Sequence, residues 1–160
     1  MLNRKYKQVS ADVLTLNAKG SIVSKSKAGG IPIRGVIVKP QPTPTTMTTA
    51  ASITAAKMLG GIILATPTAT GSTVAYTLPT GTLMEAAVEF AVNDSFDWTI
   101  INKALAAADT ITVTATTDHT LEGVSIISSL HTTIASVSGN VASFRTRKVS
   151  AGVFETYRIA

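Results

Sequence analysis

Residues 96–101 read FDWTII and alternate large apolar side chains with mostly polar ones. Residues 110–114 read TITVT and alternate in the same way. A two-residue period places the apolar side chains on one face of a β-strand, and Thr and Val favour strands. The two stretches therefore predict strands that are buried on one face, and they decide the fold class in favour of β-structure.

Shorter stretches of the same character surround these two strands, separated by Gly, Pro and Asn. The further strands that we expect are 62–64, 73–78, 124–127, 133–137, 142–146 and 153–159. Short strands at this spacing are typical of a two-sheet sandwich. We predict an all-β protein, an antiparallel β-sandwich of jelly-roll type with one or two short helices, and we find no repeat of fixed period.

The first helix is expected over 52–59. Four alanines, at positions 50, 51, 55 and 56, favour a helix there. Thr49 or Ser52 would cap its N-terminus, and Gly60 stands where a left-handed C-cap is wanted. Two turns do not persist in isolation, so this helix must dock on the body.

Thr82 and Glu85 have the spacing of a capping box, so a second helix is expected to begin there. It would run to about Phe90. Residues at core-facing spacing in this helix are Leu83, Ala86, Ala87 and Phe90.

Positive charge is concentrated at the N-terminal end of the chain. The first forty residues hold eight of the fourteen Lys and Arg and one acid, a formal charge of +7, whereas the rest holds six bases against eight acids, −2. Seven of the eight aromatic residues lie at Tyr76 or later, so a core can form only there. We predict a basic extended N-terminal arm with a Pro-rich linker over 1–45 and a β-sandwich body over 46–160.

The arm is expected to bind a partner, since it cannot bury enough apolar surface to fold alone. Nucleic-acid-binding arms carry comparable charge, but here apolar residues separate the bases and only Tyr6 could stack on a base. Interleaved bases and apolar residues fit an extended strand laid on an acidic protein surface. The bases expected to make this contact are Arg4, Lys5, Lys7, Lys19, Lys25, Lys27, Arg34 and Lys39.

The sequence offers little for catalysis. It has no Cys, which excludes disulfides and thiolate chemistry, and it has no Walker loop, dinucleotide fingerprint or nucleophile elbow. His119 beside Asp118 could contribute to a metal site with Glu122, but strand neighbours point to opposite faces, so surface polar residues are predicted. Glu85 and Glu89 share a helix face and are expected to be solvated. We predict no enzyme activity, no cofactor and no metal site.

Two further features have alternative interpretations. Trp98 could be a sugar-stacking platform, but its alternation with Phe96 and Ile100 favours a core position. Arg145, Arg147 and Lys148 could bind a phosphate or an acidic partner, although a solvated turn is the default expectation.

No membrane attachment is expected. Residues 58–84 carry no charge and are long enough to cross a bilayer, but prolines, glycines and many threonines interrupt them. The N-terminus also lacks the apolar segment of a signal peptide.

From about residue 50 to 160 the chain resembles a group of β-sandwich structural proteins of tailed phages and large DNA viruses. Proteins of this group serve as decoration, cement or vertex proteins. The segments that carry the resemblance are 51–63 (ASITAAKMLGGII), 76–81 (YTLPTG), 93–102 (NDSFDWTIIN), 144–148 (FRTRK) and 156–159 (TYRI). The resemblance implies a role on the virion surface, often as a trimer, and supplies no catalytic residues.

Together these observations lead us to expect a non-enzymatic capsid decoration or cement protein, made in the host cytoplasm and located on the capsid surface. Its partners would be the major capsid protein or other virion subunits, and further copies of itself. A fibre or vertex head that binds a host receptor or glycan is the first alternative. A nucleic-acid-associated protein that uses the basic arm is the second.

Overall fold

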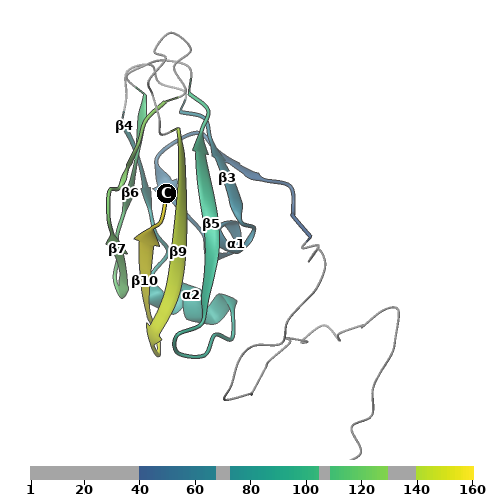
Figure 1. Cartoon of the computed structure of the whole chain (residues 1–160), viewed down its shortest axis with the longest axis vertical. Coiled ribbons are helices and arrows are strands. Elements are labelled where there is room, and N and C mark those ends of the chain that lie inside the picture. The colour runs from purple at the N-terminus through teal and green to yellow at the C-terminus, as the bar shows by residue number, and fades with distance from the viewer. Residues whose placement is uncertain (1–39, 68–72, 105–108, 130–139) are drawn as a thin grey trace, which may run out of the picture. The chain divides into compact units, whose positions relative to one another are not determined.

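The structure is a computed structural model that describes residues 40–67, 73–104, 109–129 and 140–160 (Figure 1). The basic arm with its eight bases and the strand expected at 133–137 lie outside the described residues. The described residues belong to one compact unit. The described elements are β1 (Thr45–Met47), β2 (Ala51–Ser52), α1 (Ala55–Leu59), β3 (Ile62–Ala65), β4 (Thr73–Thr77), α2 (Gly81–Ala87), β5 (Ser95–Asn102), β6 (Thr110–Thr114), β7 (His119–Glu122), β8 (Ile126–Ile127), β9 (Val141–Ser150) and β10 (Val153–Arg158).

The strands form two sheets that share one core, so the body is mostly β-structure, as predicted. The larger sheet has the order β1-β3-β5-β9-β10-β7, and the smaller has the order β2-β4-β6-β8. Figure 1 shows β5, β9 and β10 in one layer and β4 and β6 in another. Inward side chains from both sheets, such as Phe144 and Tyr76, belong to a single hydrophobic cluster.

The antiparallel jelly-roll arrangement that the sequence led us to expect is not confirmed, because both sheets are mixed. Of the eight described strand pairs, five are parallel and three are antiparallel. The cause lies in the connections. From β1 to β9 successive described strands alternate between the two sheets. A chain that visits the other sheet before it returns can place its next strand parallel to the previous one.

Two of the crossings from the larger to the smaller sheet, β3 to β4 and β5 to β6, have matched ends, and we call residues 62–77 and 99–114 the matched arches. Ile62 of β3 pairs with Thr99 of β5, and Thr73 of β4 pairs with Thr110 of β6. Both ladders therefore join positions 37 apart (62 to 99, and 73 to 110). The connections 66–72 and 103–109 consequently have the same length. The sequence shows little of this repeat because only the register is repeated.

Threonines stack in register where the two arches meet in the smaller sheet. The hydroxyl oxygens of Thr73 and Thr110 lie 2.8 Å apart, and those of Thr77 and Thr114 lie 3.1 Å apart. Each hydroxyl therefore has a partner across a parallel strand pair, which adds side-chain hydrogen bonds to the backbone ladder.

Large aromatic side chains fill the core beneath the larger sheet. Trp98 is 1% exposed, and its ring stacks on Phe144 with centroids 4.6 Å apart. Ile100 is fully buried and Phe96 packs against the same cluster. The core position of Trp98 is thereby confirmed, and a sugar-stacking role for it is excluded.

The first helix is shorter than expected and has a different cap. Ser52 belongs to β2, and the helix begins after Thr54, whose hydroxyl accepts a hydrogen bond from the amide of Lys57. Gly60 is right-handed, and the left-handed residue is Gly61, with φ of 83°. Ser52 cannot cap the helix because it pairs with β4 in the smaller sheet, so Thr54 is the N-cap instead.

The second helix also differs from its prediction. Its N-cap is Thr80, which accepts from the amide of Leu83, and it ends at Ala87. Met84 is buried while Leu83 is 59% exposed, so the expected core face was wrong. A Cβ on Gly81 would lie 1.8 Å from the Gly152 carbonyl oxygen and 2.6 Å from that of Asp118. The helix thus starts in a space that only Gly can occupy, and tertiary contact sets its register.

Candidate functional site

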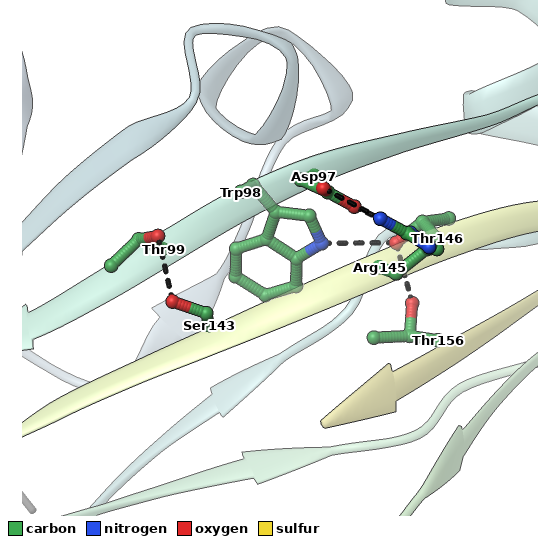
Figure 2. Close-up of polar contacts among 7 residues, drawn as sticks. All are labelled: Asp97, Trp98, Thr99, Ser143, Arg145, Thr146 and Thr156. Carbon is green, nitrogen blue, oxygen red and sulfur yellow. Dashed lines mark hydrogen bonds and ion pairs between the residues drawn. The ribbon is translucent and has the colours of Figure 1, made fainter. Parts of the chain in front are cut away.

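The outward face of β5, β9 and β10 carries a row of paired charges. Arg145 donates from Nε to Asp97 Oδ1 at 2.7 Å and from a second guanidinium nitrogen to Oδ2 at 2.9 Å (Figure 2). The two residues face each other across the β5–β9 ladder. Bidentate pairing of this kind is strong for its class, yet both side chains remain about half exposed, so salt screens it.

Arg147 joins the same face through three neighbours. It donates to the Asn93 amide oxygen at 2.8 Å, to Glu155 at 3.1 Å and to the Tyr157 hydroxyl at 3.3 Å. Tyr157 in turn donates to the same Glu155 oxygen. That hydroxyl, followed by Arg147, lowers the pKa of the Glu155 carboxyl. Asn93, Glu155 and Tyr157 thus already accept hydrogen bonds from the Arg147 guanidinium.

Lys148 points to the opposite face of β9 and is buried. Its ammonium donates to Glu85 of α2 at 2.5 Å and to the Phe90 carbonyl at 2.9 Å. The other Glu85 oxygen accepts from the amide of Gly152 at 3.2 Å. The hydrogen bond from Lys148, then that from Gly152, lowers the pKa of the Glu85 carboxyl. Glu85 is therefore a clamp between α2 and the β9–β10 turn, and not half of the predicted capping box.

The three bases at the end of β9 do not form one binding site. Arg145 and Arg147 face outward, Lys148 faces inward, and each is paired with a carboxylate. The interpretation of this cluster as a solvated turn is wrong for Lys148. Strand alternation separates neighbours that the sequence places side by side.

His119 is fully buried, which corrects its prediction as a surface polar residue. It begins β7, where Phe154 of β10 lies opposite. Its Nδ1 lies 2.8 Å from the Pro79 carbonyl oxygen, and its Nε2 lies 2.8 Å from the Thr156 hydroxyl. Burial lowers the pKa of the His119 imidazole, and the hydrogen bond to Pro79 raises it by a smaller amount. The ring is therefore neutral at pH 7.

The hydroxyl of Thr156 continues this contact into a buried chain of hydrogen bonds. Thr156 lies 2.7 Å from the Thr146 hydroxyl, and the indole N–H of Trp98 donates to Thr146 at 2.9 Å (Figure 2). We call the series Trp98, Thr146, Thr156, His119 and the Pro79 carbonyl the buried polar chain. Every side chain in it is 1% exposed or less. Sequence reasoning missed it because its members come from five separate segments.

The described residues hold no group of three or more His, Asp and Glu side chains with the geometry of a metal site. Across the same ranges no helix is long and apolar enough to cross a membrane. Two surface hollows are present. One is lined by Gly123, Val124 and the last three residues, and the other by Ser95, Phe96, Asp97 and Arg145. Neither contains the buried polar chain.

Comparison of the chain with protein-family models, with curated proteins and with solved structures finds no match in any of the three. The resemblance to virion structural proteins therefore stays a prediction from the sequence.

Proposed function

We propose that the chain is a non-enzymatic virion structural protein, a decoration or cement protein whose basic arm anchors it to the capsid. The part of the predicted arm that precedes the compact body would lie along neighbouring subunits such as the major capsid protein. The body would be displayed on the capsid surface, and we favour a trimer of bodies.

The observation that carries this proposal is the distribution of positive charge along the chain, together with its pairing in the described body. In the described body Arg145, Arg147 and Lys148 are each paired with a carboxylate. The body's other bases, which lie in or beside α1, β5 and β10, are Lys57, Lys103 and Arg158. The first forty residues, in contrast, hold eight bases and one acid. An acidic partner would consequently be attracted to the arm.

The energetics of the arm favour a protein surface as its partner. Ordering some 40 residues costs about 1–2 kcal/mol each in backbone entropy. Only a long strip of contact can offset this cost, and apolar residues between the bases add burial to charge pairing. Strand addition also supplies backbone hydrogen bonds that salt does not screen.

The test is binding of the full chain to genome-free capsid shells and to duplex DNA, measured from low to high salt. We expect shell binding that partly survives high salt, because burial and backbone hydrogen bonds persist after screening. We expect weak DNA binding that disappears, since counterion release supplies most non-specific affinity.

Two variants give the matched comparison. Replacement of the eight arm bases by Gln should abolish shell binding, while the double variant Lys57→Gln, Lys103→Gln in the body should bind like wild type. Tight DNA binding without affinity for shells would contradict the proposal in favour of a nucleic-acid role. Binding to host glycans that survives loss of the arm bases would favour a receptor-binding head.

A further inference from the structure

The buried polar chain has one consistent arrangement of hydrogens. A carbonyl can only accept, so Nδ1 of His119 carries a hydrogen and donates to Pro79. In the neutral ring Nε2 must then accept from the Thr156 hydroxyl. The Thr156 oxygen accepts from Thr146, whose own oxygen accepts from the Trp98 indole. Four donors thereby meet four acceptors, and all four hydrogen bonds point the same way.

A second proton on His119 breaks this match. Nε2 would become a donor to the Thr156 oxygen, so the Thr156 hydroxyl hydrogen would lose its acceptor. Were that hydrogen to turn toward Thr146, the Thr146 hydroxyl hydrogen would lose its acceptor instead, so within the chain one hydroxyl hydrogen is unsatisfied in either arrangement. Acid would therefore place a positive charge and an unsatisfied hydroxyl in a site with no exposed side chain.

The groups packed around the imidazole do not compensate such a charge. On β10 the ring of Phe154 lies 6.0 Å away in a tilted contact. Lys148 of β9 is a cation and is paired with Glu85 of α2. Asp118, which precedes His119, is exposed and offers its backbone oxygen to the Phe154 amide. Within the described body the imidazole forms hydrogen bonds to Pro79 and Thr156 only.

We propose that the buried polar chain is an acid-sensitive clasp: it holds the edge strand β7 and the Pro79 corner to β9 and β10 while His119 is neutral, and it must open before His119 can take up a proton. The clasp lies at one edge of the larger sheet. β7 is a four-residue strand at the end of the larger sheet. His119 is the side chain that ties it to the corner before α2. The inference does not depend on the proposed virion role.

The direction of the pH effect follows from which state binds the proton. In the unfolded chain a His takes up a proton as the pH falls through about 6.5. The folded chain resists that proton because its imidazole is buried, so the unfolded state binds more protons and stability falls with falling pH. A His that stays neutral in the folded chain makes the folding equilibrium constant about tenfold smaller at pH 5.5 than at neutral pH, which is the largest effect that this one group can have there. The effect should be absent above about pH 7.5.

The experiment is chemical unfolding of the full chain between pH 7.5 and 5.5, a window above the range in which ordinary carboxylates titrate. The variant His119→Gln keeps a donor and an acceptor but cannot take up a proton, and His131→Gln is the matched control for the other imidazole. We expect wild type and His131→Gln to lose about tenfold in the folding constant, and His119→Gln to change by less than twofold. Equal pH dependence in all three proteins would overturn the proposal.

A measurement on the wild-type protein keeps the test decisive if His119→Gln does not fold. Nitrogen-15 NMR of the histidine rings reports which ring nitrogen carries hydrogen. We expect His119 to show a hydrogen on Nδ1 only, unchanged to pH 5.5 in the folded state. A ring that carries its hydrogen on Nε2, or that titrates in the folded state with an ordinary midpoint, would show that no clasp exists.

Discussion

The two faces of β9 solve the same problem of placing polar groups in opposite ways. Outward, Arg145 and Arg147 meet carboxylates and remain in contact with water. Inward, Thr146 joins Thr156 of β10 in a chain of neutral groups without exposure, and the one charge that the described strand carries on that face, Lys148, is paired with Glu85. The outward network has charge but is screened, whereas the inward chain has no charge and no alternative partner in water. Cutting the inward chain should therefore cost much more than cutting the outward one.

The largest expected effect is the loss of the indole that both packs the core and starts the buried polar chain. Trp98→Ala should destabilise the body by about 3–5 kcal/mol, because it leaves a cavity beside Phe144. Equilibrium denaturation of the full chain measures this loss. Trp98→Phe keeps most of the volume and removes the N–H, so it should cost a smaller amount. A Trp98→Ala protein as stable as wild type would contradict the core position of the ring.

The next effect isolates the hydrogen bonds from the packing. Thr156→Val keeps the shape of the side chain and removes the hydroxyl, which leaves both Thr146 and His119 without their partner. An unsatisfied buried group costs about 1–3 kcal/mol. Thr99→Val removes the partly buried hydroxyl that lies 3.3 Å from Ser143 and should cost about 0.5 kcal/mol or less. Equal losses of unfolding free energy in the two variants would mean that the buried polar chain contributes no more to stability than a partly exposed hydroxyl pair.

The smallest effect is expected on the outward face. Arg145→Gln removes the bidentate pair with Asp97, and both side chains are about half exposed. We expect a change in unfolding free energy that is detectable at low salt and absent at high salt, because ions screen the pair. Unfolding curves at two salt concentrations check this. A salt-independent loss as large as that of Thr156→Val would erase the contrast between the two faces.

The sequence predicted the strands of this body well where one face is buried. The alternation in 96–101 and 110–114 matches β5 and β6, because the two-residue period reports burial of one face directly. The same period occurs in parallel and antiparallel strands, so it holds no information on direction. The mixed sheets follow from crossings between layers, which no local pattern encodes.

The buried polar chain left a weaker signal in the sequence. His119 and Leu121 alternate with Thr120 and Glu122, which is the pattern of a strand with its first and third residues inward. A reading by period alone would have placed His119 inside. The polarity of imidazole favoured the surface, and the partners that satisfy it lie 37 and 40 positions away. The sequence does not show which distant residues will supply the hydrogen-bond partners of a buried polar group.

The matched arches have a consequence for the lengths of the two connections. Because β3 pairs with β5 and β4 pairs with β6 at one shared offset, the connections 66–72 and 103–109 must span the same gap between the layers. An insertion or deletion in one connection alone would make neighbouring arches unequal in reach. Equal lengths of the two connections are therefore what keeps the matched arches equal in reach, and a change in one of them would be expected to alter this end of the body before it alters the paired strands.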